Sequence, residues 1–113
     1  MSEHDEQVAV VEYLEAIGAL FYAVPNGGHR NKATAARLKA EGVRAGVPDL
    51  CIPMARGPYH SLYIEMKRSD GTASDVRDSQ YEWINALRDE GMAAFACFGT
   101  DNAIACIDWY MAL

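Results

Sequence analysis

The run of residues 61–67 constrains the fold more than any other part of the sequence. Within it, apolar and other side chains alternate in the order Leu62, Tyr63, Ile64, Glu65, Met66 and Lys67. This period of two predicts a β-strand, because neighbouring side chains of a strand point to opposite faces of the sheet. One face of the strand therefore packs on an apolar core. The other face carries an acid and a base, Glu65 and Lys67, side by side.

A second short strand is predicted just upstream. Residues 49–52 form a compact apolar run that begins with Asp49, after Gly46, Val47 and Pro48. Proline disfavours a helical conformation at the residue before it, which favours an extended or turning backbone here. Asp49 then lies at the N-terminal end of a buried strand. If this strand pairs with 61–67, the carboxylates of Asp49 and Glu65 lie close together.

Helix and strand patterns alternate through the rest of the chain, with Gly18, Gly42 and Gly91 at predicted helix ends. The predicted elements are helix 4–17, strand 20–24, helix 32–41, strand 49–52, strand 61–67, helix 74–90 and strand 92–98. A turn and helix N-cap at residues 99–101 then lead into a last helix that ends near residue 111. The predicted apolar stripes are Val8, Val11, Leu14 and Ile17 on the first helix, and Tyr81, Ile84 and Leu87 on the long helix.

Composition and charge exclude several classes of protein. Half of the 113 residues are apolar and 23% are charged, which favours one folded domain over residues 1–113 and excludes a disordered chain. The net charge of -6 disfavours a protein that coats nucleic acid. However, half of the ten basic residues lie in one short segment, at Arg30, Lys32, Arg37, Lys39 and Arg44. A solvated helix face explains this cluster as well as a nucleic-acid surface does.

The cysteines and the hydropathy pattern indicate the compartment. Cys51, Cys97 and Cys106 stand far apart with no CxxC pair, which is typical of buried thiols in a reducing compartment. The longest apolar stretch of low charge, residues 92–98, is too short to span a bilayer. We therefore expect a cytoplasmic protein with no membrane partner and no small-molecule cofactor.

The three residues Asp49, Glu65 and Lys67 suit the hydrolysis of a phosphodiester bond. Mg²⁺ binds hard oxygen ligands, commonly one or two protein carboxylates, and two acids on adjacent strands offer such a partial cage. Lys67 shares a strand face with Glu65, so its ammonium can orient water or stabilise developing charge. The Met66 side chain is expected in the core, while its carbonyl offers a further ligand. These residues predict a metal-dependent nuclease.

Pro48-Asp49 followed by Glu65-Met66-Lys67 resembles the signature of the PD-(D/E)xK nuclease superfamily, and the order of elements resembles its core. Over nearly its whole length the chain most closely resembles the VRR-NUC (virus-type replication-repair nuclease) family. The matching features are Glu3 followed by Gln7, Pro25-Asn26-Gly27-Gly28 with Arg30, Gly42 and Gly46 before Pro48-Asp49, Glu65-Met66-Lys67, and Gln80.

The resemblance implies a restriction-endonuclease-like α/β fold. Its core has the order αβββαβ, with a mixed central sheet flanked by helices and, in this chain, an extra basic helix between the first two strands. It also implies Mg²⁺ or Mn²⁺ bound by Asp49, Glu65 and the Met66 carbonyl, with Lys67 as the catalytic lysine. One metal ion or two would satisfy the same ligands.

The resemblance assigns supporting roles to both flanking helices. Gln80 would support the site from the long helix, although an exposed helix residue is the alternative. Glu3 would be the first-helix carboxylate near the site, with Glu6 as its competitor for that role. Both acids are also favourable at a helix N-terminus without any catalytic part.

Family members of phage or bacterial type that stand alone are homodimers, and some act on four-way (Holliday) junctions. The resemblance thus implies a homodimer, branched DNA as the substrate and a role in DNA repair. The expected DNA contacts are the loop and basic helix around Asn26, Arg30, Lys32, Arg37, Lys39 and Arg44. Three alternatives stay open: a non-catalytic nucleic-acid-binding module of the same fold, a nicking or flap nuclease, and a restriction-type nuclease.

Overall fold

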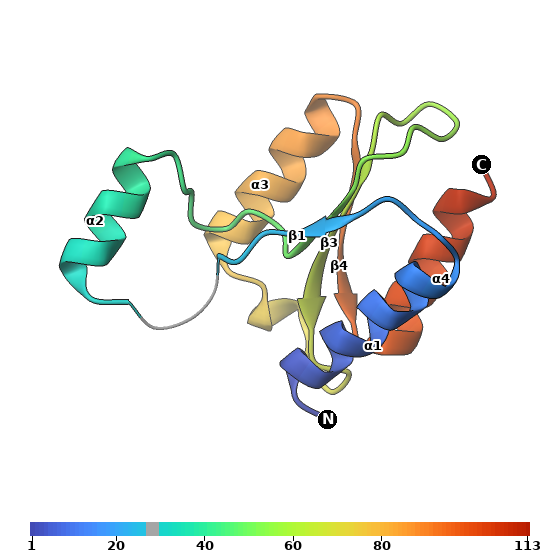
Figure 1. Ribbon diagram of the computed structural model, residues 1–113, viewed down its shortest axis with the longest axis horizontal. Coiled ribbons are helices and arrows are strands. Elements are labelled where there is room, and N and C mark those ends of the chain that lie inside the picture. The colour runs from blue at the N-terminus through green and yellow to red at the C-terminus, as the bar shows by residue number, and fades with distance from the viewer. Residues whose placement is uncertain (27–29) are drawn as a thin grey trace.

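The computed structural model describes residues 1–26 and 30–113. Gly27, Gly28 and His29, in the loop expected to contact DNA, lie outside the described residues. A four-stranded sheet forms the centre, with helices on both of its faces (Figure 1). In chain order the elements are α1 (Glu3–Ala16), β1 (Tyr22–Ala23), α2 (Lys32–Ala40), β2 (Leu50–Ile52), β3 (Leu62–Lys67), the 3₁₀ turn η1 (Ala73–Asp75), α3 (Asp78–Asp89), β4 (Ala93–Phe98) and α4 (Thr100–Met111).

The sheet has the order β1-β2-β3-β4. The β1/β2 and β2/β3 pairs are antiparallel, whereas β3 and β4 run parallel, joined by a crossover through α3. Pairing of β3 with β4 runs the full length of both strands, from Leu62 opposite Ala93 to Lys67 opposite Phe98. The predicted mixed sheet is confirmed, and the strand that carries Glu65 and Lys67 lies in its interior.

The larger core lies between one face of the sheet and the pair α1 and α4. The strands contribute Leu50, Ile52, Leu62, Ile64 and Met66, and the helices contribute Val10, Leu14, Ala103, Ile107 and Tyr110. This confirms the alternation predicted for β3, because its three apolar residues are fully buried on this face. On the opposite face α3 packs through Ile84 and Leu87 against Ala94 of β4.

Helix α2 confirms the predicted basic helix and stands apart from the rest of the molecule (Figure 1). None of its nine residues, all within the described part of the chain, is buried. Asn31 caps the helix by accepting a hydrogen bond from the Thr34 N–H at 2.8 Å. Since α2 contributes nothing to the core, its Lys and Arg side chains are left in solvent.

The apolar stripe predicted for the first helix is wrong in part. Val8 and Ile17 are 41% and 43% exposed, whereas Val10 is fully buried. The buried side of α1 instead consists of Glu6, Val10 and Leu14, which follow one another at intervals of four residues. A glutamate therefore occupies a position that apolar periodicity assigns to the core.

The single helix predicted over residues 74–90 is also wrong, because it is interrupted after η1. Val76 is buried and has an extended backbone (φ -83°, ψ 119°), so the chain leaves helical geometry to place this side chain inward. Helix α3 then begins at Asp78. Tyr81, predicted on the apolar stripe, is 40% exposed, while Ile84 and Leu87 are buried as predicted.

The remaining expectations about the chain concern thiols and membranes. Cys51 and Cys97 are buried free thiols, as predicted, whereas the free thiol of Cys106 is only half-buried. In the described residues no helix has the length and apolar character needed to cross a membrane.

Candidate active site

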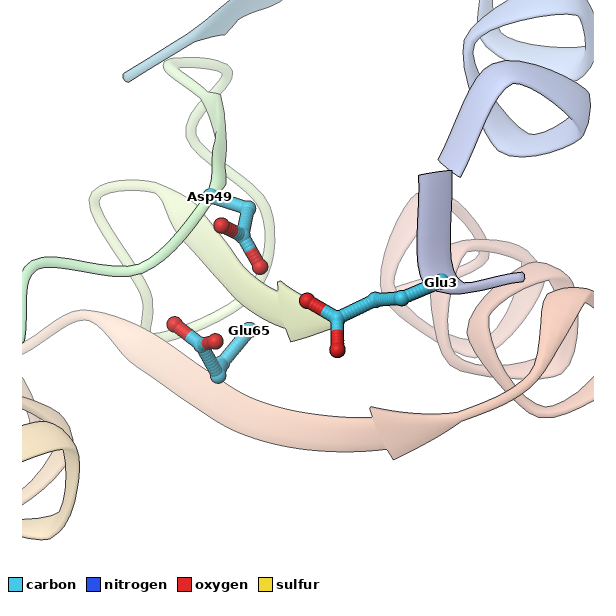
Figure 2. A group of neighbouring side chains, drawn as sticks. All are labelled: Glu3, Asp49 and Glu65. Atoms are coloured by element: carbon cyan, nitrogen blue, oxygen red, sulfur yellow. The ribbon is translucent and has the colours of Figure 1, made fainter. Parts of the chain in front are cut away.

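Three carboxylates from separate parts of the chain converge at the end of the sheet (Figure 2). They belong to Glu3 at the start of α1, Asp49 just before β2, and Glu65 on β3. One oxygen atom of each lies within 4.8 Å of the other two. Figure 2 shows the Glu3 side chain extended from α1 toward the other two acids. Three hard oxygen donors so close together fit a divalent cation such as Mg²⁺ or Mn²⁺.

Asp49 is held in place at the start of β2. Pairing between β2 and β3 stops at Leu50, which lies opposite Ile64. Beyond this point the Met66 N–H has no strand partner on that side, and it donates instead to Asp49 Oδ2 at 2.7 Å. The Asp49 carbonyl accepts from the Val24 N–H at 2.8 Å. The Asp49 side chain thus accepts the hydrogen bond that a neighbouring strand would otherwise accept, and this contact fixes its carboxylate beside β3.

Glu65 and Lys67 are buried although both are charged residue types, with only 3% and 7% of their surface exposed. Lys67 Nζ lies 3.7 Å from Glu65 Oε2. The same oxygen accepts a hydrogen bond from Gln80 Nε2 at 3.1 Å. Gln80 is itself fixed, because its Oε1 accepts from the Arg77 N–H at 2.9 Å at the start of α3. The structure therefore brings Gln80 to the site predicted from the sequence.

The crowding of acids changes the proton affinity of Glu65. Burial, followed by the neighbouring charge of Asp49 and a hydrogen bond with it, raises the pKa of Glu65 to about 8. Glu3 adds to this effect, whereas the Lys67 ammonium opposes it. A bound cation would remove the penalty by favouring the ionised carboxylate. Glu65 thus holds a proton near neutral pH unless positive charge is supplied to the cluster.

The acids open onto a cavity of about 660 Å³. Its lining combines Glu3, Asp49 and Glu65 with the basic side chains of Arg30, Lys39, Arg44, Lys67 and Arg77. Of the residues predicted to contact DNA, Asn26, Arg30, Lys39 and Arg44 line this cavity. Lys32 and Arg37 lie outside the lining, exposed on α2. An anion that reaches the acids therefore passes close to several cationic groups.

Several of these polar side chains also hold the connection between α2 and the sheet. The Asn26 amide donates to the Arg44 carbonyl. Arg44 Nη1 donates to the Lys39 carbonyl at 2.9 Å, and Arg30 Nη2 donates to the Pro25 carbonyl at 2.7 Å. The two segments that lead into and out of α2 are thus joined at its base, where they border the cavity.

Arg77 is a site residue that sequence reasoning missed. It lines the main cavity and also a second one of about 380 Å³, which Glu3, Lys67 and Arg68 help to form. The sequence-based interpretation placed it inside a continuous helix, where it had no reason to face the acids. Its position three residues before Gln80 is the one signal that was available, because residues three apart on a helix share a side.

The competition between Glu3 and Glu6 has a clear geometric outcome. Glu3 lies in the acid cluster, whereas the Glu6 carboxylate is bound to the backbone N–H groups of Ser69 and Thr100. Met66 has its side chain fully buried, as expected. The ligand role of its carbonyl stays a prediction.

The raised pKa of Glu65 makes the stability of the metal-free protein depend on pH. Because folding raises this pKa from 4.5 to about 8, ionisation of Glu65 costs the folded state stability as the pH rises through that interval. Glu65→Gln removes this loss. In EDTA we expect its Tm to match wild type near pH 4.5 and to exceed it by at least about 5 °C at pH 8.

Thermal unfolding followed by circular dichroism at the two pH values measures this difference. Glu82→Gln is the matched control, since Glu82 is an exposed acid on the same helix as Gln80 and should leave the pH dependence unchanged. A Tm difference between Glu65→Gln and wild type that does not change with pH would contradict the assignment.

Comparison with known proteins identifies the family of the chain. A family model for the VRR-NUC domain matches residues 1–101. A solved structure described as a VRR_NUC domain protein is similar, with a TM-score of 0.86 and 31% sequence identity, over 100% of this chain and 90% of that chain. No curated protein gives a match. The family match spans every residue of the acid cluster, and the chain belongs to the VRR-NUC family, with the nuclease-type module that defines it.

Proposed function

We propose that this chain is a divalent-metal-dependent endonuclease that hydrolyses DNA phosphodiester bonds, with residues 1–113 acting as one nuclease domain. The observation that supports it most is the convergence of Glu3, Asp49 and Glu65 within 4.8 Å, next to Lys67. The acids are too close together to be favourable without a cation, and they line a cavity that is otherwise rich in basic side chains. A phosphate is the substrate group that suits both features.

In this proposal Asp49 and Glu65 hold Mg²⁺ or Mn²⁺, with the Met66 carbonyl as a further ligand and Glu3 completing the acidic side of the site. When bound, such a cation supplies Lewis-acid charge and lowers the pKa of water. Gln80 orients the Glu65 carboxylate through its hydrogen bond. The Lys67 ammonium, 3.7 Å from Glu65, orients the attacking water or stabilises charge that develops on the phosphate.

The DNA backbone is expected to run from the acids toward α2. Arg30, Lys39 and Arg44 border the cavity, and Lys32 and Arg37 extend the positive surface along the exposed helix. Neutralising phosphates with such side chains gives affinity that does not depend on base sequence. The local excess of basic residues offsets the overall charge of -6 where the substrate binds.

The preferred substrate and the assembly are proposed on the family resemblance. Resolution of a four-way junction takes two symmetric cuts, and a C₂ homodimer supplies two equivalent sites. We therefore propose a homodimer that cuts branched DNA during repair, in the cytoplasm of a bacterium or of a phage-infected host. A monomer that cuts flaps or nicks duplex DNA would retain the chemistry and change the biological role.

Loss of the Lys67 ammonium tests the catalytic assignment. Lys67→Met keeps the length and burial of the side chain but removes its charge, so the fold should persist. We expect the cleavage rate to fall by about 10² to 10³, as when one stabilising donor is removed from an active site, while Mn²⁺ binding changes little. The assay is cleavage of labelled junction, flap, single-stranded and duplex DNA in Mg²⁺, Mn²⁺ or EDTA.

Arg56→Met is the matched control for Lys67→Met, because it makes a similar change at a basic residue outside both cavities of the site. It should cut at the wild-type rate. Wild-type cutting by Lys67→Met would overturn the role of Lys67. If the wild type binds DNA and cuts none of the substrates, the non-catalytic module of the same fold is the better description.

Arg77 should bind a phosphate near the site. In a Lys67→Met background, Arg77→Ala should weaken DNA binding and reduce the slope of log K against log salt by about 1, as expected for one lost phosphate contact. Fluorescence anisotropy over a salt series measures both quantities. Arg56→Ala is the control, and an unchanged slope in Arg77→Ala would show that this guanidinium contacts no phosphate.

A further inference from the structure

Glu6 is a buried acid that the proposed chemistry does not use. Only 5% of its surface is exposed. Its Oε2 accepts a hydrogen bond from the Ser69 N–H at 2.8 Å, and its Oε1 accepts from the Thr100 N–H at 3.2 Å. The Thr100 hydroxyl also donates to the Glu6 carbonyl at 3.2 Å. Burying a carboxylate is costly, but hydrogen bonds from backbone N–H groups to both oxygens offset that cost.

The two N–H donors belong to segments that leave the centre of the sheet. Ser69 follows the end of β3 by two residues, and Thr100, the first residue of α4, follows the end of β4 by two residues. Gly99 stands at the N-cap of α4, and glycine has no side chain with which to cap a helix. Glu6 supplies that cap from α1, and a negative charge is favourable at a helix N-terminus.

Gly99 leaves the room that this contact needs. Its φ of +89° is in the region that favours glycine, and an added Cβ would lie 2.7 Å from the Ser69 Cβ and 3.2 Å from Glu6 Oε1. A larger residue would therefore push apart the groups that meet at the Glu6 carboxylate. The first turn of α1, the chain after β3 and the start of α4 are joined at this point.

Glu6 lies one turn along α1 from Glu3. Residues three apart on a helix project from the same side. Hydrogen bonds that fix the helix at Glu6 therefore also fix the backbone position from which the Glu3 side chain extends. Glu3 is the first residue of α1, and the capping box between Ser2 and Asp5 closes this turn on itself without joining it to the sheet. Among the described residues, no hydrogen bond holds the Glu3 carboxylate itself. The next buried residue of α1 is Val10, more than one turn beyond Glu6.

We propose that Glu6 is a positioning residue that holds the Glu3 carboxylate at the acid cluster by clamping the first turn of α1 to the ends of β3 and β4. This inference rests on the proposed function, because it needs Glu3 to act on a bound cation. The Glu6 carboxylate acts through backbone N–H groups and does not contact the cation.

The clamp acts through α1 more than through β3. Strand β3 is paired on both sides, to β2 and along its full length to β4. The Gly99 N–H also donates to the Lys67 carbonyl at 2.9 Å. Lys67 and Glu65 therefore stay in place when the clamp is removed. The first turn of α1 instead loses the two hydrogen bonds of the Glu6 carboxylate and keeps the one from the Thr100 hydroxyl to the Glu6 carbonyl.

A double-mutant cycle on Mn²⁺ affinity tests this inference without an activity assay. Glu6→Ala should weaken Mn²⁺ binding about tenfold, in the range found when a residue that orients a metal ligand is lost. Glu3→Gln should weaken binding as well. In the double variant, Glu6→Ala should add little to Glu3→Gln, because the clamp acts through the carboxylate that Glu3→Gln removes. Calorimetry or electron paramagnetic resonance with MnCl₂ measures the affinity.

Two further variants separate positioning from general loss of stability. Val10→Ala weakens the packing of the same helix but leaves the clamp, so its Mn²⁺ affinity should match wild type. Glu6→Gln keeps the shape of the side chain and one acceptor oxygen. It should give a smaller loss than Glu6→Ala, and it takes the place of that variant in the cycle if Glu6→Ala does not fold.

The outcomes are distinct. Wild-type Mn²⁺ affinity in the folded Glu6 variants, or an equal loss of affinity in Val10→Ala, overturns the positioning role and leaves the proposed function intact. A full, additive loss in the double variant also overturns it, because Glu6 would then act independently of Glu3. If the wild-type protein binds no Mn²⁺, the metal-dependent function and this inference both fail.

Discussion

The parallel pairing of β3 with β4 is the interaction on which the rest of the structure depends. It makes β3 an interior strand, so Leu62, Ile64 and Met66 are buried against α1 and α4 while Glu65 and Lys67 lie on the opposite face. A parallel pair needs a crossover, and the crossover through α3 brings Gln80 to Glu65. The same sheet ends in loops that receive the first turn of α1 through Glu6, which places Glu3 beside the other acids.

Repulsion within the acid cluster lowers the stability of the folded state. Burial of Glu65 on an interior strand, together with the nearby carboxylates of Asp49 and Glu3, raises its pKa to about 8. A chain selected for stability alone would place apolar or uncharged groups here, as it does on the other face of β3. A ligand that binds only the folded state repays such a cost. The unfavourable charge is thus a physical reason to expect a cation at this position, independent of the family match.

Local patterns in the sequence predicted the sheet and brought Asp49 and Glu65 together, because strand alternation and a proline boundary are local properties. The resemblance added Glu3 and Gln80. What sequence reasoning missed depends on distant contacts: Glu6 is buried because its N–H donors lie 63 and 94 residues away in the chain. Likewise, burial of Val76 divides the predicted long helix and turns Arg77 toward the acids. Apolar periodicity assigns burial by residue type. It cannot predict a buried polar residue whose hydrogen-bond donors are backbone N–H groups far away in the chain.

The most direct test of the account is anomalous X-ray diffraction from crystals grown with MnCl₂ at a pH above 8, where Glu65 is ionised. We expect a manganese peak bonded to carboxylate oxygens of Asp49 and Glu65 at about 2 Å, with Glu3 on the same side. Mn²⁺ bound at full occupancy elsewhere on the protein, with none at Glu3, Asp49 and Glu65, would contradict the proposed metal site.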